Sequence, residues 1–457
     1  MAAGEGTRMR SLLPKMLHPV CGRPMVAWPI LAAREGVGAE WVVAIVSPER
    51  DLVSGLPDKV RIVTQPESDG TGGAVRAALP LIRDAEAVLV LSGDHPLLSA
   101  ETIAGLLAAH REAGAAATVM TAVLDDPGSY GRVVRDESGD LARIVEAKTA
   151  GDATPEELAI REVNAGTYAF AAAPLADALE RIGNDNAQGE YYLGDVLPLM
   201  RDAGLRVAVH PAPDSTVMLG INTRAELALA EAEARRRILE AHMLAGVTVV
   251  DPASTWIDAG VRIAADTRIE PGTSLRGRTE VGAGCVVGPL TTLIDTTLGD
   301  EITVPHSYLV ECEVDDGCNV GPFAYLRPDA ALEAGAKAGA FVEVKNSRIG
   351  EGAKVPHLAY VGDAEIGAGS NLGAGTITAN YDGFRKHRTV IGENARIGVD
   401  TMLIAPVEVG DDAYTGAGAV IQDDVPEGAL AVSENAQRNI DGYAERKATE
   451  MQEEKSS

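Results

Sequence analysis

The chain has 457 residues, of which 46% are hydrophobic and 23% are charged, and its formal net charge is −27. This length predicts two or more domains, and the negative charge argues against a nucleic-acid partner because phosphate backbones repel such a surface. There is no apolar run long enough for a bilayer, no secretory signal, and no metal-ligand or disulfide spacing among the four cysteines. We therefore expect a reduced, cytoplasmic protein without membrane insertion.

The chain opens with a glycine-rich, cationic stretch, "MAAGEGTRMRSLLPK" at 1–15. Glycines let backbone N–H groups approach an anion, and Arg8 and Lys15 add positive charge, so the stretch predicts a phosphate-binding loop. It fits neither the P-loop nor the dinucleotide fingerprint. Such loops normally follow a buried strand, and none precedes this one.

Residues 1–220 alternate short apolar runs with helical stretches. Strands are predicted at 40–47, 60–65 and 87–94, and helices at 72–85 and 99–114. This alternation predicts a parallel α/β sheet with right-handed crossovers. Asp94 follows a strand at the sheet edge where ligands bind. Taken alone, we would interpret it as a helix N-cap.

A helix is predicted at 223–246, with Thr223 and Glu226 as a capping box and Gly246 at its end. From about 250 the sequence has a six-residue period, as in "IDAGVR", "IEPGTS" and "VGAGCV". This period is typical of a left-handed parallel β-helix. Cys285 and Cys318 occupy its fifth, inward position and are interpreted as packing residues. The predicted domains are 1–220, a helical arm at 221–247, the β-helix at 248–430 and a tail at 431–457.

Several motifs occur in the order known from one enzyme family. They are "LLPK", "QPESDGTGGA", "SGDHPL", "YGRVVR", "IVEAK", "VNAGTY" and "GINTRAEL", followed by the β-helix repeats. Over nearly its entire length the chain resembles the bifunctional N-acetylglucosamine-1-phosphate uridylyltransferase/glucosamine-1-phosphate N-acetyltransferases of bacterial cell-wall precursor synthesis. The resemblance implies a Rossmann-like α/β nucleotidyltransferase domain and a left-handed β-helix. It also implies acetyl transfer from acetyl-CoA to glucosamine 1-phosphate, then uridylyl transfer from UTP to N-acetylglucosamine 1-phosphate, releasing pyrophosphate.

The resemblance also implies a set of site residues in the first domain. The nucleotide and its phosphates would contact Ala2, Ala3, Gly4, Arg8, Lys15, Gln65, Gly70, Thr71, Ser92, Gly93 and Asp94. The sugar would contact Gly131, Glu146, Asn164 and Asn222. Asp94 and Asn222 would hold one Mg²⁺, a hard cation that keeps several waters. With Arg8, Lys15 and Asn222 in the matching pattern, we favour this metal site over the N-cap interpretation of Asp94.

In "VPHLAY", Val355 and Ala359 fill inward positions, so His357 should face outward. A lone histidine is more often structural or solvent-exposed than catalytic. The resemblance implies that His357 is the general base that takes a proton from the attacking amine. It places Arg327, Lys345, Tyr360 and Asn371 around the sugar phosphate. Acetyl-CoA would contact Ala374, Asn380, Tyr381, Lys386, Val399 and Ala417, and the site would lie between subunits of a homotrimer.

Four features depart from the family pattern. The apolar strand before Ala2 is absent, which should damage the uridylyl domain and is explained simply by a misplaced start site. Gly194 stands where Thr is expected, Val399 replaces a Ser, and Glu434 falls where some relatives place a coenzyme-binding Arg. Arg438 is a candidate substitute for that Arg.

Two alternatives stay open. A single-activity nucleotidyltransferase could use the β-helix only to oligomerise, but it would lack the combination of His357, Asn380 and Lys386. A non-catalytic binding subunit with the same domain pair would not retain Arg8, Lys15, Asp94 and Asn222.

Overall fold

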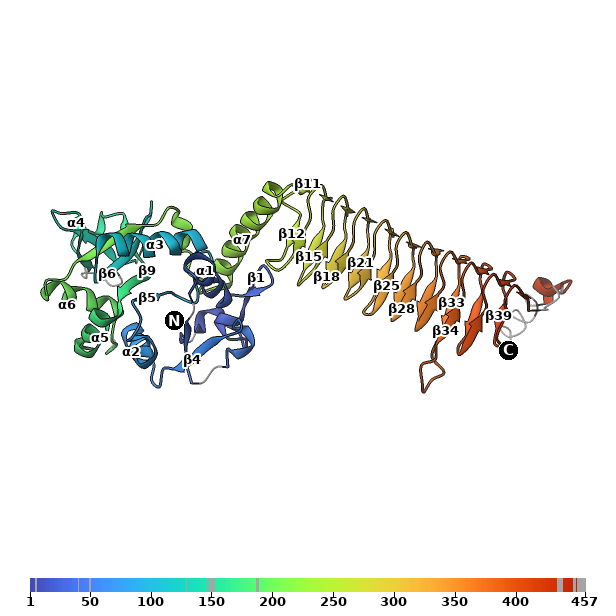
Figure 1. Ribbon diagram of the computed structural model, residues 1–457, viewed down its shortest axis with the longest axis horizontal. Coiled ribbons are helices and arrows are strands. Elements are labelled where there is room, and N and C mark those ends of the chain that lie inside the picture. Colours follow the sequence, from blue (N-terminus) through green and yellow to red (C-terminus); the bar gives the residue numbers. More distant parts are fainter. Residues whose placement is uncertain are drawn as a thin grey trace. The chain divides into compact units, whose positions relative to one another are not determined.

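The computed structural model describes residues 1–4, 6–39, 41–48, 51–128, 130–145, 147, 153–185, 189–433, 439–446 and 449. The chain forms two compact units (Figure 1). The first, here called the N-terminal unit, comprises Met1–Ala241 and Ile257–Gly260. The second, the β-helix unit, comprises His242–Trp256 and Val261–Ser457. Within the described part of the chain, no helix is long and apolar enough to cross a membrane.

The N-terminal unit contains ten strands in its described residues. They are β1 (Pro19–Val20), β2 (Arg23–Pro24), β3 (Val42–Val46), β4 (Val60–Thr64), β5 (Ala87–Val90), β6 (Ala117–Val123), β7 (Arg132–Arg135), β8 (Leu141–Val145), β9 (Glu162–Ala171) and β10 (Val207–Pro211). The predicted strands at 40–47, 60–65 and 87–94 are confirmed as β3, β4 and β5. β3 and β4 form a two-stranded parallel sheet, and the larger sheet has the order β10-β6-β9-β7-β8 with β5 beside β9.

The expectation of a single parallel sheet is wrong. β9 runs antiparallel to β5, β6 and β7. β7 and β8 are joined by a short turn around Gly139, which permits only an antiparallel pair, because parallel neighbours need a long crossover. Predicted alternation of strands and helices therefore identified the elements but not the direction of every strand.

Helices cover these sheets. They are α1 (Ala27–Val37), α2 (Thr71–Ile82), α3 (Ala100–Ala113), α4 (Pro155–Leu158), α5 (Ala172–Arg181), α6 (Val196–Asp202) and α7 (Arg224–Leu244). The ends of α3 have physical causes: the Ser99 hydroxyl accepts a hydrogen bond from Thr102 N, and Gly114 adopts φ 56° at the C-cap. The predicted capping box of α7 is confirmed, since Glu226 N donates to Thr223 Oγ1 and Glu226 Oε2 accepts from Thr223 N.

The β-helix unit has three parallel sheets whose strands stack coil upon coil (Figure 1). The first sheet contains β11 (Thr248–Val249), β14 (Arg268–Ile269), β17 (Val286–Val287), β20 (Thr303–Val304), β23 (Asn319–Val320), β26 (Lys337–Ala340), β29 (Lys354–His357), β32 (Asn371–Leu372), β35 (Arg396–Ile397), β38 (Tyr414–Thr415) and β40 (Leu430–Ala431). The second contains β12 (Trp256–Ile257), β15 (Ser274–Arg276), β18 (Thr292–Ile294), β21 (Tyr308–Val310), β24 (Tyr325–Leu326), β27 (Glu343–Lys345), β30 (Tyr360–Gly362), β33 (Ile377–Ala379), β36 (Met402–Ile404) and β39 (Val420–Ile421).

The third sheet contains β13 (Arg262–Ile263), β16 (Glu280–Val281), β19 (Thr297–Leu298), β22 (Glu313–Val314), β25 (Ala330–Leu332), β28 (Ser347–Ile349), β31 (Ala364–Ile366), β34 (Thr389–Ile391) and β37 (Val407–Val409). The six-residue period therefore predicts the architecture correctly. Cys285 and Cys318 are buried at their inward positions, as predicted. The exposed side chains of these short strands alternate with buried ones, so each sheet presents one outer face on which a site can form.

Candidate functional site

The N-terminal loop is folded around Lys15. Two short 3₁₀ turns, Thr7–Met9 and Lys15–Leu17, follow Gly6, which adopts φ 64°. A Cβ atom on Gly6 would lie 2.5 Å from Lys15 Cβ, so only glycine permits this approach. Lys15 is only 6% exposed, and the fold directs its long side chain into the unit.

The Lys15 ammonium joins two residues that are distant in sequence. Its Nζ donates to Asp94 Oδ2 at 2.7 Å and to Asn222 Oδ1 at 2.8 Å. The backbone reinforces this arrangement, because Ile221 N donates to Asp94 O at 3.0 Å and Asn222 N donates to Glu226 Oε2 at 2.7 Å. The capped start of α7 therefore positions Asn222 beside Asp94.

Asp94 carries a negative charge at neutral pH. Burial raises the pKa of its carboxyl, but the neighbouring His95 and Lys15 lower it by more, so that the net pKa lies below the ordinary value. Burial and the nearby Lys15 lower the pKa of His95, against the opposing effect of Asp94. The alternative interpretation of Asp94 as a helix N-cap is wrong, because the next helix, α3, is capped by Ser99.

The predicted base-reading residues form a second tight cluster. Gln65 is buried, and its Nε2 donates to Asp69 Oδ1 at 2.6 Å and to Gly70 O at 3.0 Å. Gly70 has φ 99°, and a Cβ there would lie 2.5 Å from Tyr191 O. The hydroxyl of Thr71, which begins α2, accepts a hydrogen bond from Leu193 N at 3.0 Å.

Sequence reasoning missed Asp69 and Tyr191 in this cluster. Tyr191 N donates to Asp69 O, and Gly72 N donates to Tyr191 O, both at 2.7 Å. The Arg76 guanidinium lies over the Tyr191 ring and pairs with Asp69 at 3.2 Å. Both residues stand in or beside conspicuous motifs, but only the fold brings the segment at 190–193 against the segment at 69–72.

Of the predicted sugar contacts, Gly131 directly precedes β7 and Asn164 lies on the neighbouring β9. Asn164 N donates to Gly131 O at 2.9 Å, and the Asn164 side chain is held by Tyr168 OH and Gly166 N. Glu146 lies outside the described residues. Tyr130, which the sequence analysis did not single out, lies near Glu226 and Asp94. Burial and the negative charges of these two residues raise the pKa of the Tyr130 hydroxyl.

The remaining predicted contacts are at the loop and the end of β5. Ala2 N donates to Ile45 O and Gly93 N donates to Met1 O, both at 2.8 Å. Ala3 and Ser92 are half-buried, whereas Gly4 and Arg8 are exposed. Burial raises the pKa of the Glu226 carboxyl, but hydrogen bonds from Asn222 and Thr223 and the charge of the exposed Arg8 together lower it by more. The loop therefore presents its charge toward the start of α7.

In the β-helix unit, His357 is exposed at the end of β29, as predicted. Strand register aligns it with the predicted coenzyme residues, because Lys354 pairs with Asn371, Asn371 with Arg396, and Arg396 with Tyr414. Three residues beyond these positions stand His357, Ala374, Val399 and Ala417. They form one column along a corner of the β-helix, rising by about 4.8 Å per coil. No hydrogen bond or ion pair engages the His357 side chain in the described part of the chain.

The predicted phosphate-binding residues gather on the outer face of the second sheet. Arg327 Nη1 donates to Glu343 Oε1 at 2.8 Å, and Lys345 Nζ lies 3.9 Å from Asp363 Oδ2. Lys345 also adjoins Lys386 and lowers the pKa of the Lys386 ammonium by hydrogen bonding and repulsion. The Tyr360 hydroxyl lies against Gly362, and a Cβ atom added to Gly362 would be 2.4 Å from the hydroxyl oxygen. Asn371 belongs instead to the first sheet, beside the column that begins with His357.

Asp363 organises this cluster, and sequence reasoning missed it. Its Oδ1 accepts from Asn346 Nδ2 at 2.6 Å, and its Oδ2 accepts from Asn380 Nδ2. Asn380 opens the loop that protrudes between β33 and β34 (Figure 1). Within this loop, Tyr381 OH donates to Gly383 O, and His387 lies 2.7 Å from Asp382.

Two of the departures from the family pattern can be located. Gly194 lies in a 3₁₀ turn, Leu193–Asp195, where an added Cβ would meet no atom within 4 Å, so the site has room for a threonine. Val399 is 52% exposed within the column. Glu434 and Arg438 lie outside the described residues.

Comparison with known proteins agrees with this organisation. A MobA-like NTP transferase domain matches residues 1–193, and a bacterial transferase hexapeptide model of six repeats matches residues 388–423. The chain is 49% identical to the bifunctional protein GlmU of Mycobacterium bovis BCG Pasteur, over 98% of this chain and 92% of that protein. It is 48% identical to GlmU of Brevibacillus brevis, over 97% of this chain and 96% of that protein.

GlmU of Kineococcus radiotolerans is 51% identical over 97% of this chain and 90% of its own length. Identity at this level over both units confirms the predicted combination of a nucleotidyltransferase fold with a hexapeptide β-helix. The chain belongs to the family of bifunctional GlmU transferases.

Proposed function

We propose that the N-terminal unit transfers a uridylyl group from UTP to N-acetylglucosamine 1-phosphate, and that the β-helix unit first forms that sugar phosphate by acetylating glucosamine 1-phosphate. The observation that carries the first half is the convergence of Lys15, Asp94 and Asn222. These residues join a cation to two hard oxygen donors at the sheet edge of an α/β fold, where phosphorylated ligands bind.

Mg²⁺ is the proposed cofactor of the uridylyl site. Asp94 and Asn222 supply a carboxylate oxygen and an amide oxygen, the donor types that suit this ion. Both oxygens already converge on one cationic atom, Lys15 Nζ, so the site is shaped for positive charge. When bound, the ion would neutralise phosphate charge, while Lys15 and Arg8 hold the remaining phosphate oxygens and the segment at 65–74 holds the base.

Acetyl transfer is assigned to the corner and outer face of the β-helix. The free side chain of His357 is available as a general base for the glucosamine amine. Arg327, Lys345 and Lys386 supply positive charge for the sugar phosphate. The column from Ala374 to Ala417 offers the coenzyme a row of positions on successive coils, about 10 Å long from the strand spacing.

A homotrimer is proposed because an exposed apolar ladder ends beside His357. The ladder consists of Leu290, Phe323, Phe341 and Leu358, with the half-buried His306 between Leu290 and Phe323; these residues occupy the same corner in successive coils. Phe323 and Phe341 stack at 5.2 Å between ring centroids and are 53% and 59% exposed. A run of exposed aromatic and aliphatic side chains is typical of an interface. The four cysteines are free and buried, in keeping with the proposed cytoplasmic location.

The test assays the two half-reactions separately on the full chain with Mg²⁺. Pyrophosphate release is followed from UTP and N-acetylglucosamine 1-phosphate, and thiol release from acetyl-CoA and glucosamine 1-phosphate. Lys15→Ala should reduce only pyrophosphate release, with the exposed Arg10→Ala as its control. His357→Asn should reduce only thiol release, with Lys354→Ala on the same strand as its control.

Other outcomes would identify the alternatives. Pyrophosphate release without thiol release would indicate a single-activity nucleotidyltransferase. The absence of both activities from a folded chain would contradict the enzymatic proposal and favour a binding subunit.

A further inference from the structure

Asp69 lies between β4 and α2, and both of its carboxylate oxygens have a partner. Its Oδ1 accepts a hydrogen bond from Gln65 Nε2 at 2.6 Å. Its Oδ2 pairs with the Arg76 guanidinium at 3.2 Å, and this guanidinium lies over the Tyr191 ring, 4.1 Å from the ring centroid. Charge-assisted contacts on both oxygens hold the carboxylate in one orientation.

Gly73, in the first turn of α2, provides the space that this carboxylate occupies. A Cβ atom added to Gly73 would lie 1.9 Å from Asp69 Oδ1 and 2.3 Å from Asp69 Cγ, so a larger residue would displace the Asp69 side chain. Glycine is disfavoured inside a helix compared with alanine, and Gly73 is not one of the glycines that adopt a positive φ in this chain. The glycine is therefore explained by the position of Asp69 and not by the backbone.

The orientation of the Gln65 amide follows from its two partners. Nε2 faces two groups that can only accept, Asp69 Oδ1 at 2.6 Å and Gly70 O at 3.0 Å. A flipped amide would bring Oε1 against these oxygens with no hydrogen between them, and the charge of Asp69 makes that orientation still less favourable. Gln65 is buried, and no residue in the described part of the chain donates to its Oε1. The free group of Gln65 is therefore an acceptor.

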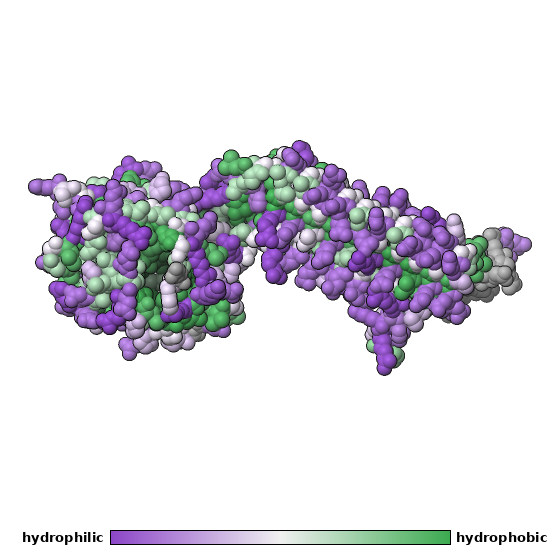
Figure 2. All heavy atoms as spheres, viewed as in Figure 1, coloured by the Kyte–Doolittle hydropathy of each residue, from purple (hydrophilic) through white to green (hydrophobic). Residues whose placement is uncertain are grey.

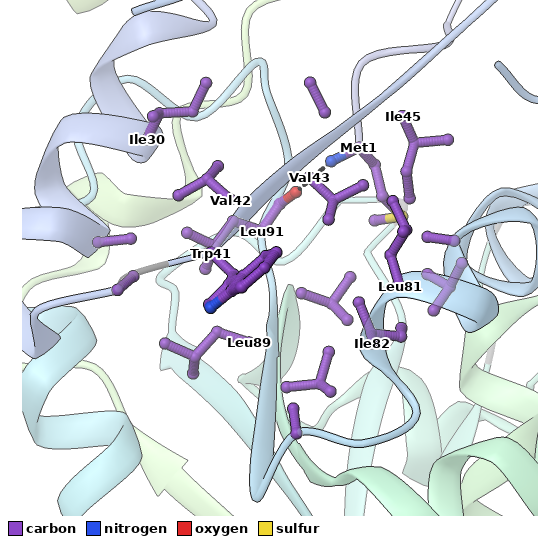
Figure 3. Close-up of a pocket in the computed structure, with 18 of the residues that line it drawn as sticks. Met1, Ile30, Trp41, Val42, Val43, Ile45, Leu81, Ile82, Leu89 and Leu91 are labelled. Carbon is purple, nitrogen blue, oxygen red and sulfur yellow. Dashed lines mark hydrogen bonds between the residues drawn. The ribbon is translucent and has the colours of Figure 1, made fainter. Parts of the chain in front are cut away.

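This polar cluster differs from the apolar cavity in the same unit. The cavity, of about 680 Å³, lies beside β3 and β5, and the residues labelled around it in Figure 3 are all hydrophobic. In Figure 2 the visible face of the unit is hollowed, and apolar residues border the hollow. A nucleobase loses hydrogen bonds to water when it is bound, and an apolar wall cannot replace them. The cluster around Gln65 can, because it offers a fixed acceptor.

We propose that Asp69 is a positioning residue that holds the Gln65 amide with its oxygen toward the base, and that it thereby makes the site select uracil over cytosine. This inference rests on the proposed function, which assigns base binding to the segment at 65–74. Uracil carries a hydrogen on ring nitrogen N3, whereas N3 of cytosine is an acceptor. A fixed acceptor on the protein pairs with N3 of uracil and is left unpaired against N3 of cytosine.

The test measures binding of UTP and of CTP to the full chain with Mg²⁺ by isothermal titration calorimetry, together with pyrophosphate release. The parent chain should bind UTP more tightly than CTP. Asp69→Ala should lower this preference about tenfold, because the freed amide can turn its nitrogen toward N3 of cytosine, and should leave kcat for UTP nearly unchanged. Glu67→Ala, which removes an exposed carboxylate from the same segment, is the control and should keep the preference.

Two further variants separate positioning from a structural role. In a Gln65→Ala background, Asp69→Ala should not lower the preference further, since Asp69 acts through that amide, whereas independent structural effects would add. Gly73→Ala should lower the preference of the parent as Asp69→Ala does, because the added methyl group displaces the carboxylate. In an Asp69→Ala background, Gly73→Ala should leave the preference unchanged and raise the unfolding midpoint of the N-terminal unit.

An unchanged preference for UTP in Asp69→Ala would overturn the inference and leave the uridylyl assignment standing. Additive losses in Gln65→Ala and Asp69→Ala would also overturn it, as would a parent chain that binds both nucleotides equally or binds neither. A preference for UTP that Asp69→Ala removes, in a parent that releases no pyrophosphate, would support the inference and contradict the uridylyl assignment instead.

Discussion

Lys15 illustrates how one side chain connects the loop, the sheet edge and the start of a helix. Its ammonium is the partner of both Asp94 and Asn222, so the charge of Asp94 is compensated inside the fold. Removing one member of a buried pair leaves the other charge unpaired, which is more destabilising than removing both. The same residue is therefore important for stability, in addition to the role in phosphate binding that is proposed for it.

We expect Lys15→Met to lower the free energy of unfolding of the N-terminal unit by about 3 kcal/mol, because Asp94 loses its partner. Mg²⁺ should raise the unfolding midpoint more in this variant than in the parent, since the lysine no longer occupies the two oxygens. Thermal unfolding with and without Mg²⁺ measures both effects. An equal response to Mg²⁺ in Lys15→Met and in the double variant Lys15→Met/Asp94→Asn would contradict the metal site.

Asp363 has a comparable role in the β-helix unit as a positioning residue. Burial raises the pKa of the Asp363 carboxyl, but hydrogen bonds from Asn346 and Asn380 and the charge of Lys345 together lower it by more. Asp363 is therefore ionised at neutral pH. Asp363→Asn should reduce kcat for acetyl transfer about tenfold, because Asn380 and Lys345 lose a charged acceptor, equivalent to about 1.4 kcal/mol. Glu365→Gln, an exposed neighbour paired with Arg388, is the control.

A merely structural role for Asp363 would lower the unfolding midpoint and leave kcat per folded enzyme unchanged. Steady-state kinetics together with the thermal midpoint separates the two interpretations, and Asp363→Glu should restore part of kcat.

At the scale of elements, β3 and β5 border an apolar cavity of about 680 Å³ that is lined by Ile45, Leu89 and Leu91 among others. Met1 and Ala2 lie at one end of the cavity, where their backbone nitrogens donate hydrogen bonds to Leu91 O and Ile45 O. Apolar side chains that line a cavity lose contacts with partner atoms, which lowers stability.

The free energy of unfolding of the N-terminal unit should depend on pH, because the α-amino group of Met1 is buried. Because burial lowers its folded-state pKa from 8.0 to about 6, the unfolded state binds more protons in that window. The free energy of unfolding should therefore rise between pH 6 and pH 8, by about 3 kcal/mol at most. Denaturant unfolding at several pH values measures the slope. A chain acetylated at Met1 should lack this part of the slope, and identical slopes would contradict the buried charge.

At the scale of the whole molecule, the β-helix unit carries its apolar ladder along one corner, where the aromatic side chains stack on one another and still expose more than half of their surface. A ladder that continues to His357 links assembly to acetyl transfer. Burial of this ladder by a second copy would enclose the proposed base within an interface.

We expect Phe341→Glu to convert a trimer into monomers, because a carboxylate would be buried against apolar partners, and to reduce thiol release with it. Pyrophosphate release should be unaffected. Sedimentation velocity and the two assays measure this, with the exposed Phe384→Glu in the protruding loop as a control for added charge. A monomeric parent chain would rule out the trimer directly.

Local sequence patterns were sufficient to predict the elements and the residue types on which the proposed chemistry depends. Periods of six residues identify the β-helix because each inward position must be aliphatic or small, as at Val355 and Cys285. The capping box at Thr223 and the strand at 42–46 are likewise local patterns. His357 could be assigned to the outer surface from its neighbours alone, and the family could be named from motif order.

Which of these residues lie in contact depends on how distant segments of the chain pack together. Asp94 and Asn222 follow Lys15 by 79 and 207 positions in the sequence. No local pattern indicates that the Lys15 ammonium contacts both of them. Asp69, Tyr191 and Asp363 act through contacts between distant segments. The direction of β9 also emerges only when strands pair, because hydrogen-bond register is a property of two segments and not of one.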